Sequence, residues 1–408
     1  MTVTNSAQVL TINAGSSSIK FALYALDPEP KIAFDGTIDD IGGAHSRFTV
    51  HGSTSDQVDR LFPIPERVTA VNVLVDWLLT RLQPDSLAAI SHRVVFGSAD
   101  YGSTRRVDSF LLSDLYDAVT SDPEHLPLEI HLIEVLQQHF PLASHFACFD
   151  SHFHARMAPV ASMLAIPRRY IDAGVKRLGF HGLSCAYLMR ALTIADANQA
   201  QGKVIIAHLG GGASITAIEN GVSQDTSMGL TPASGMMMGE RTGDIDPGLA
   251  WHLARTDGMT AATFNHMVNY ESGLIGVSGS SADVRVLLAR ENHDKHAREA
   301  IDLFCYQGRK TICAMAGAID GMQTLIFTGG IGEHSAAIRT RICAGLSHLG
   351  ITLDAASNSG GAAIISRAGA AVTVRVMHTD EQWMLADQAR VALAEQASSH
   401  AQVFAPEN

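Results

Sequence analysis

The sequence is poor in cysteine, in aromatic residues and in long apolar runs. Its 408 residues include five cysteines and 6% aromatic residues, and no two cysteines form a C-x-x-C pair. An odd number of widely spaced cysteines argues against a disulfide framework and against a cysteine zinc site. No apolar stretch reaches the ~18 residues of a membrane-spanning helix, and the N-terminus lacks the basic region and apolar core of a signal peptide. We therefore expect a reduced, cytoplasmic protein.

Basic residues are also scarce. Lys and Arg number 29 against 41 Asp and Glu, which gives a net charge of −12. Such a surface repels nucleic acid and anionic membranes, so a phosphate site would need local basic residues. The 19 histidines contain no H-E-x-x-H motif. The closest pair, His152 and His154, has no third ligand at a motif spacing, so we expect no structural metal there.

Two similar hairpins lie about half the chain length apart. Apolar runs at 9–12 and 19–24 flank the polar turn 13–18, and runs at 204–207 and 213–218 flank the glycine turn 208–212. A repeat at this spacing predicts two related domains, each presenting one turn to a shared cleft. The backbone N–H groups of such turns can face an anion.

Strands and helices alternate along the rest of the chain, which predicts an α/β fold. Apolar runs predict strands at 87–95, 145–149 and 325–327. Apolar periodicity predicts helices over 67–82, 128–139 and 296–320, and another from Asp380 towards the chain end. The Gly-, Ala- and Ser-rich stretch 355–370 is expected to be a mobile loop.

Four glycine-rich turns, at 13–18, 208–212, 276–281 and 329–332, favour a nucleotide or phosphate site. None matches the P-loop pattern G-x-x-x-x-G-K-[ST]. The stretch from Gly330 to Ser335 resembles most of G-x-G-x-x-G, but it lies late in the chain and ends in serine. A nicotinamide site is therefore disfavoured.

Three charged residues beside the predicted strands have both a functional and a structural interpretation. Lys20 follows the first turn and is either a phosphate ligand or a solvated strand lysine. Arg93, at an apolar strand end, needs a carboxylate or phosphoryl ligand, or else a structural salt bridge. Asp150 ends a strand where α/β active sites collect their acids, although it would also serve as a cap.

Three further residues have the same double interpretation. His181, between glycines, would donate to developing phosphoryl charge or simply occupy a turn. Arg241 lies in the long irregular segment 225–247 and is either a counter-charge to a transferring phosphoryl group or a surface arginine. Glu381 would hold Mg²⁺, or favour a helix N-terminus through its charge.

Taken in order, these motifs resemble the acetate kinase family, within the superfamily of sugar kinases, heat-shock chaperones and actins. The resemblance implies an actin-like (ribonuclease H-like) fold with two related domains around a nucleotide cleft. The domains would be 1–150, an N-terminal acyl kinase domain, and 151–383, a nucleotide-binding domain, with the helix at about 384–408 packing back on the first. The motifs that carry the resemblance are Asn13–Lys20, His92–Val95, Phe149 with Asp150, Gly179–Gly182, Asp225–Gly229, Arg241–Pro247 and Phe327–Glu333.

The resemblance implies a cytoplasmic homodimer that reversibly transfers the γ-phosphoryl group of ATP to acetate with Mg²⁺, or Mn²⁺, giving acetyl phosphate and ADP. Asn13 and Glu381 would hold the metal. Asp150, His181 and Arg241 would be catalytic, since a carboxylate already ionised at pH 7 needs positioning and positive charge more than a strong base. The implied substrate-binding residues are Arg93 for the carboxylate and Val95, Phe180 and Pro232 for the methyl group. The implied nucleotide and phosphate residues are Ser16, Ser18, Lys20, His208, Leu209, Gly210, Gly211, Gly212, Asp283, Val284, Arg285, Gly330, Ile331, Gly332, Glu333 and His334.

The sequence departs from the family pattern at a few positions near the expected site. Phe96 replaces a histidine, Cys185 and Gly211 change two of the turns, and Glu124 stands where the family packs the acyl methyl group. The alternatives are therefore a kinase for propionate or another short carboxylate, and a non-catalytic sensor of nucleotide or acyl phosphate. The intact catalytic and metal positions argue against the sensor.

Overall fold

The computed structural model describes residues 7–15, 18–26, 28–43, 45–53, 56–97, 102–120 and 122–403. Ser16, expected to face the phosphates, lies outside these residues. The chain divides into two compact units. The first unit is Met1–His152 with Asp380–Asn408, and the second is Phe153–Thr379. No helix within the described residues is long and apolar enough to cross a membrane.

The first unit is built on an eight-stranded mixed sheet with the order β5-β4-β3-β2-β1-β6-β8-β7. The hairpin predicted around residues 13–18 is confirmed, because β1 and β2 pair antiparallel. β6 and β8 continue the sheet on the other side of β1, parallel to it. The strands are β1 (Ala7–Ala14), β2 (Ile19–Leu26), β3 (Pro30–Asp39), β4 (Arg47–His51), β5 (Val58–Leu61), β6 (Ala89–Val94), β7 (Thr104–Arg106) and β8 (Ser144–Phe149).

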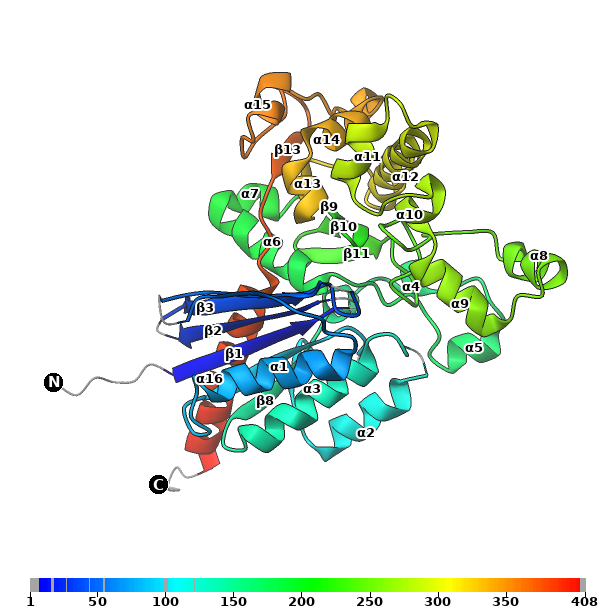
Figure 1. Ribbon diagram of the computed structural model, residues 1–408. Coiled ribbons are helices and arrows are strands. Elements are labelled where there is room, and N and C mark those ends of the chain that lie inside the picture. The colour runs from blue at the N-terminus through cyan, green and yellow to red at the C-terminus, as the bar shows by residue number, and fades with distance from the viewer. Residues whose placement is uncertain are drawn as a thin grey trace. The chain divides into compact units, whose positions relative to one another are not determined.

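Helices cover both faces of this sheet because strand side chains alternate between its faces. Leu10 and Ile90 pack in the core formed with α1 and α3, whereas Val9 and Ala89 pack against Ala389 of α16. Figure 1 shows α1 and α3 together along one side of the sheet. The helices of this unit are α1 (Arg67–Leu79), α2 (Ser109–Ala118), α3 (Leu126–His139) and α16 (Glu381–Val403).

The helix predicted from Asp380 is confirmed. The Asp380 carboxylate accepts a hydrogen bond from the backbone N–H of Trp383 at 2.8 Å, as an N-terminal cap does. The cap fixes where α16 begins and therefore where the side chain of Glu381 stands.

The second unit repeats the central topology of the first. Its sheet has the order β11-β10-β9-β12-β13, which matches β3-β2-β1-β6-β8 in both order and strand direction. The expectation of two related domains is thereby confirmed at the level of the fold. The strands are β9 (Lys203–Leu209), β10 (Ala213–Glu219), β11 (Val222–Thr226), β12 (Thr324–Thr328) and β13 (Thr373–Val376).

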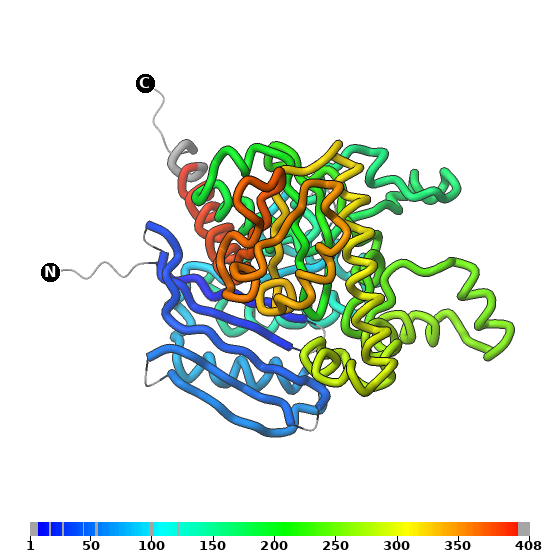
Figure 2. The backbone as a smooth tube through the Cα atoms, turned by 90° about the horizontal axis from the view of Figure 1, so that it is seen from above, coloured from blue at the N-terminus to red at the C-terminus, as the bar shows by residue number. Residues whose placement is uncertain are grey.

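Two long helices pack on this second sheet. Cys185 and Leu188 of α6 join Val204 and Ile206 of β9 in one apolar cluster, while α12 lies along β9, β10 and β11. Figure 2 shows the segments 155–177 and 245–270, in green to yellow-green, standing out from the rest of this unit. Its helices are α4 (Pro159–Ser162), α5 (Arg168–Asp172), α6 (Gly182–Ala195), α7 (Ala197–Ala200), α8 (Gly248–Thr256), α9 (Ala261–Tyr270), α10 (Gly273–Ser278), α11 (Val284–Arg290), α12 (Lys295–Ala318), α13 (Gly329–His334), α14 (Ala336–Cys343) and α15 (Ala355–Ser359).

Three sequence-based expectations need correction. The stretch 329–332 is the first turn of α13 rather than a free turn. The stretch 276–281 begins inside α10, which ends at Ser278 and is followed by the cap residue Gly279 in the left-handed region. The expected loop 355–370 contains α15 and is tied down by isolated bridges that pair Leu353 with Ser366 and Ile364 with Arg375.

An aromatic cluster in the first unit gives a test of this core. Phe21 is fully buried, with ring centroids 5.5 Å from Trp77 and 6.2 Å from Phe48. Phe21→Ala removes its contacts and leaves a cavity, so we expect the free energy of unfolding to fall by about 3–5 kcal/mol. Urea unfolding followed by circular dichroism measures the loss. Phe110→Ala, at an exposed ring of α2, is the control, and an equal effect at both positions would contradict the assigned core.

Candidate active site

Arg93 connects the ends of three neighbouring strands in the first unit. Its Nη2 donates to Oδ2 of Asp150 at 2.8 Å, and its Nη1 donates to Oδ1 of Asn13 at 3.1 Å. Because β1, β6 and β8 run parallel, their carboxyl ends meet at one edge of the sheet, where α/β proteins bind ligands. Asp150 is fully buried, and 13% of the Arg93 side chain is exposed.

The start of α16 completes this network. Nδ2 of Asn13 donates to Oε2 of Glu381 at 2.8 Å. Burial opposes the charge of Arg93 most strongly, but the Asp150 and Glu381 carboxylates outweigh that effect and raise the pKa of Arg93. The buried Nε of Arg93 has no hydrogen-bond partner among the described residues. A buried donor of this kind is a natural contact for an anionic ligand.

The segment after β6 leads to Val95 and Phe96. The N–H of Val95 donates to both carboxyl oxygens of Glu129 on α3, at 3.2 Å each. Phe96, which replaces the family's histidine, packs its ring against the apolar cluster of Val94 and Phe149. This departure is therefore an apolar packing contact, and it leaves the Arg93 network untouched.

Of the remaining first-unit positions, Ser18 and Lys20 lie around the β1–β2 turn and Glu124 lies just before α3. Ser18 is half-buried, and its carbonyl accepts from the N–H of Gly15 at 2.7 Å. Lys20 is exposed on β2, directly across the ladder from Asn13. Glu124 is half-buried, and its backbone carbonyl accepts from Nη1 of Arg67 at 2.8 Å.

In the second unit, His181 stands beside the β9–β10 hairpin. It precedes α6 and adopts the left-handed region, with φ 59°. Its Nδ1 lies 2.9 Å from Oγ of Ser214, and its ring stacks on His208 with centroids 4.2 Å apart. His208 is held in turn by Ser184, at 2.9 Å from Nδ1. These contacts fix the orientation of both rings.

Gly212 marks the point where His181 and Arg241 converge. A Cβ at Gly212 would lie 3.1 Å from Nε2 of His181 and 4.0 Å from Nη1 of Arg241. Nη1 of Arg241 also reaches the carbonyl of Pro232, at 3.4 Å. Phe180, in contrast, is buried in the interior. The hairpin turn thus places an imidazole and a guanidinium beside bare backbone.

A pocket of about 780 Å³ lies next to this hairpin turn, within the second unit. Its volume is in the range of small-molecule sites. The pocket combines glycine backbone, an apolar wall and a charged rim on which Asp283 and Arg285 form an ion pair at 2.6 Å. The lining residues are Gly210, Gly211, Ala282, Asp283, Val284, Arg285, Leu288, Gly330, Ile331, His334 and Ser335.

A family model described as the acetokinase family matches residues 8–387. The chain belongs to the acetokinase family. Family membership makes it a phosphotransferase that uses ATP and a carboxyl-group acceptor.

Named relatives support the assignment. The acetate kinase of Rhodopseudomonas palustris strain TIE-1 is 40% identical over 385 residues, which are 93% of this chain and 96% of that protein. The propionate kinase of Escherichia fergusonii is 38% identical over 399 residues, with 96% and 98% covered. The crystal structure of Porphyromonas gingivalis acetate kinase matches with a TM-score of 0.83 at 30% identity, covering 95% of this chain and all of that one. The fold is accordingly of the actin-like type.

Eight of the sixteen residues that the resemblance to acetokinases assigned to the nucleotide and its phosphates line the pocket, and the others do not. Leu209 is buried in the core. Glu333 faces away from the pocket lining, and its carboxylate accepts from the N–H of Gly329 at 2.9 Å and contacts Nδ1 of His378 at 2.9 Å. His208, Gly212 and Gly332 flank the pocket without lining it. The sequence analysis missed three lining residues, Ala282, Leu288 and Ser335.

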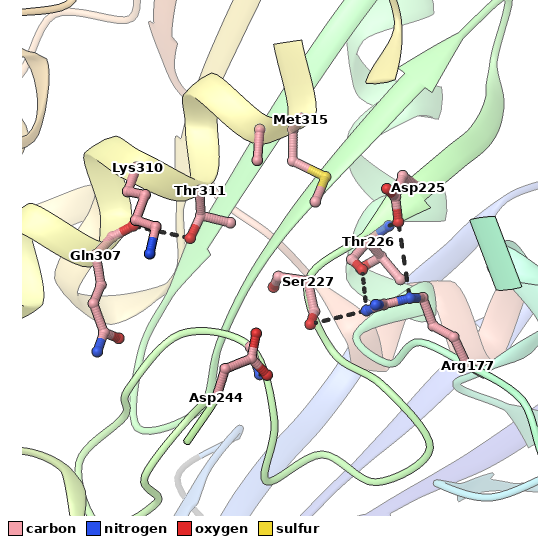
Figure 3. Close-up of a pocket in the computed structure, with 11 residues that line it drawn as sticks. Arg177, Asp225, Thr226, Ser227, Asp244, Gln307, Lys310, Thr311 and Met315 are labelled. Atoms are coloured by element: carbon pink, nitrogen blue, oxygen red, sulfur yellow. Dashed lines mark hydrogen bonds and ion pairs between the residues drawn. The ribbon is translucent and has the colours of Figure 1, made fainter. Parts of the chain in front are cut away.

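Arg177 is another residue that the sequence analysis did not single out. Its Nη1 donates to the carbonyl oxygens of Thr226, Ser227 and Met228 at 2.8–3.2 Å, and Figure 3 shows its guanidinium directed at this segment. The contact ties the family's 225–229 motif to the chain that enters the His181 turn. Its position two residues before Gly179, at the start of the glycine and histidine turn, is the feature of the sequence that could have pointed to Arg177.

Figure 3 also shows a smaller polar pocket, of about 250 Å³, next to Arg177. Asp225, Asp244 and Lys310 line it together with Gln307. Burial raises the pKa of Asp225. Asp244 accepts from the N–H of Gly235 at 2.8 Å, and Gln307 accepts from the N–H of Met237 at 2.7 Å. These side chains fix the course of the irregular segment that carries Arg241.

Gly212 gives a test of the second-unit geometry. In Gly212→Ala the new methyl group would press on Nε2 of His181, and if that imidazole is catalytic, as the family resemblance implies, even a small displacement of it lowers the rate. We expect acyl phosphate formation to fall at least about tenfold, with the melting temperature nearly unchanged. Steady-state kinetics measures the loss. Gly317→Ala on α12, where a Cβ meets nothing within 4 Å, is the control, and equal activity in both variants would refute the assignment.

Proposed function

We propose that this acetokinase-family enzyme reversibly transfers the γ-phosphoryl group of ATP to acetate, giving acetyl phosphate and ADP, in a magnesium-dependent reaction. The observation that carries the proposal is the buried network in which Arg93 binds Asp150 and Asn13 while its Nε stays unpartnered among the described residues. Relatives named acetate kinase, one of them 40% identical, support acetate as the acceptor.

In this proposal the first unit binds the acceptor. The guanidinium of Arg93 would bind the substrate carboxylate, and Asp150 would hold that guanidinium and act at the reacting centre. Val95 follows Arg93 closely enough to contact the acyl group. Ser16, Ser18 and Lys20 at the first hairpin turn would face the phosphates.

Asn13 and Glu381 would hold Mg²⁺. Their amide and carboxylate oxygens are hard ligands within one hydrogen-bonded network, which suits magnesium and also manganese. No group of three or more His, Cys, Asp or Glu in the described ranges could hold a metal, and magnesium in kinases needs only one or two protein ligands beside substrate phosphates. When bound, the ion would neutralise phosphate charge.

In the second unit, His181 and Arg241 would stabilise the planar transferring group. Ser214 and His208 orient the imidazole, and a Cβ at Gly212 would lie 3.1 Å from its Nε2. The adjacent pocket would bind the nucleotide, with Gly210, Gly211 and Gly330 allowing backbone to approach the phosphates. Such preorganised charge accounts for most of the catalysis of phosphoryl transfer.

We further propose that the enzyme is a cytoplasmic homodimer in which the first unit is the acyl kinase domain and the second the nucleotide-binding domain. Apolar side chains are exposed on the projecting segments of the second unit, among them Val160 at 85% and Trp251 at 69%. Exposed apolar side chains of this kind favour a protein interface. None of the five cysteines, all of which the structure describes, forms a disulfide, which suits a reducing compartment.

Propionate is the second candidate acceptor. A relative named propionate kinase is 38% identical over nearly the whole chain, and Glu124 replaces an apolar residue of the family's acyl pocket. Another short carboxylate, or a non-catalytic sensor of nucleotide or acyl phosphate, would follow if neither acid reacts. The complete set of catalytic positions disfavours the sensor.

Hydroxylamine trapping of acyl phosphate tests the function. With ATP and Mg²⁺, we expect product from acetate, less product from propionate, and none without ATP or with EDTA. Butyrate and short hydroxy or amino acids complete the panel. Product only from propionate would move the assignment to the second candidate. No product from any acid, with ATP binding intact by calorimetry, would refute catalysis.

Arg241→Ala tests the proposed stabilisation of the transferring group. We expect kcat to fall about a thousandfold, because a guanidinium that stabilises transferring phosphoryl charge contributes roughly this much. The affinity for ATP should change little, since Arg241 does not line the nucleotide pocket. Arg60→Ala, at an exposed arginine of β5, is the control. A kcat near that of the control would exclude the assigned role.

A further inference from the structure

Glu129 is a buried acid that the proposed chemistry does not use. It lies on α3, and only 3% of its surface is exposed. Its hydrogen-bond partner among the described residues is the N–H of Val95, which both carboxyl oxygens accept at 3.2 Å. No cation pairs with it in the part of the chain that the structure describes. Burying an ionised carboxylate without a counter-ion is costly, so such a group usually takes up a proton.

Burial and the two neighbouring carboxylates favour the neutral form of Glu129. Burial raises the pKa of Glu129 well above its usual value and the carboxylates of Asp122 and Asp150 raise it further, and together they outweigh Arg93 and the N–H of Val95, which lower it. Asp122 is itself paired with His125, at 2.9 Å. The groups that face Glu129 are thus Arg93 on β6, Asp150 after β8, and the Asp122–His125 pair before α3.

The position of Glu129 connects it to the proposed carboxylate site. Val95, to which it is hydrogen-bonded, lies two residues after Arg93. Arg93 already faces two carboxylates, Asp150 and Glu381. A third carboxylate behind the strand would compete with the substrate anion for the same positive charge.

We propose that Glu129 is a positioning residue whose neutral, protonated form holds the backbone at Val95 and keeps Arg93 available to the substrate carboxylate. The inference rests on the proposed function, in which Arg93 binds that carboxylate. A purely structural role for Glu129 would not make carboxylate binding depend on pH, whereas the proposed role does. The affinity for the carboxylate should be high while Glu129 is protonated and should fall once Glu129 loses its proton at higher pH.

The test compares the KM for acetate in the wild type, Glu129→Gln and Glu134→Gln from about pH 6 to about pH 9.5. Glutamine keeps an oxygen that accepts from Val95 but cannot ionise. Glu134 lies on the same helix, where it accepts from the hydroxyl of Tyr116 at 2.7 Å, so its variant controls for the chemical change. We expect the KM to rise about tenfold with pH in the wild type and the control and to stay nearly flat in Glu129→Gln. The KM for ATP should show no such difference.

The inference would be overturned if the KM for acetate depended on pH in the same way in the wild type and both variants. It would also be overturned if the KM of Glu129→Gln rose with pH as in the wild type. Calorimetric titration with acetate gives the same comparison without turnover. If the wild type binds acetate with this pH dependence but forms no acyl phosphate, the proposed function fails and the inference stands. If it is active without a Glu129-dependent profile, the inference alone fails.

A second measurement depends on neither substrate. Because the pKa of Glu129 is raised by folding, the contribution of Glu129 to stability is full below the usual value of 4.5 and is lost as the pH rises through the folded-state pKa. Glutamine does not titrate. The melting temperature of Glu129→Gln should therefore increase relative to that of the wild type as the pH rises from about 5 to about 8. A constant difference would show that Glu129 is ionised in the folded protein and would overturn the inference.

Discussion

The candidate site of the first unit depends on the burial of one positive charge. A guanidinium removed from water is stable only if carboxylates and hydrogen-bond acceptors surround it. Arg93 obtains these from Asp150 and Asn13, and Glu381 adds its charge through Asn13. The three partners come from β8, β1 and α16, so the pair forms only when the strands are in register and the last helix has returned to the sheet. The same interaction thus links the sheet, the chain end and the site.

The second unit uses the same strand order for different chemistry. Its hairpin turn carries glycines and has the imidazole of His181 beside it, whereas the first unit has a salt bridge at the ends of β6 and β8, and Arg241 is contributed by an irregular segment. That segment needs fixing, because it has no strand or helix of its own. Backbone carbonyls bound by Arg177, and N–H groups bound by Asp244 and Gln307, fix it in place. Hydrogen bonds from side chains next to the smaller pocket therefore hold the segment that carries Arg241, just as strand pairing holds the strand that carries Arg93.

Most of the fold could be predicted from the sequence because the strands are short apolar runs bounded by glycine or polar turns. The first turn of α13 could not. Gly329 adopts a positive φ and its N–H is held by Glu333, whose carboxylate is in turn fixed by His378, a residue distant in the sequence. Without these contacts of Glu333, which the sequence does not reveal, a glycine-rich run predicts a free turn. The charged positions Arg93, Asp150 and His181 could be chosen as candidates, but their partners could not, since Arg93 and Asp150 lie far apart in the chain.

Glu129 shows where the limit of sequence reasoning lies. A glutamate within a helix normally points to solvent, and nothing in its neighbours distinguishes it from Glu134 on the same helix. Only packing against the strand that carries Arg93 removes it from water. Two buried acids then stand near one guanidinium in different states. Asp150 is paired with the cation, whereas the partner of Glu129 among the described residues is a backbone N–H, and burial favours its neutral form. If Glu129 stays uncharged, as we propose, it sets the positive charge available at this edge of the sheet as much as the ionised acids do.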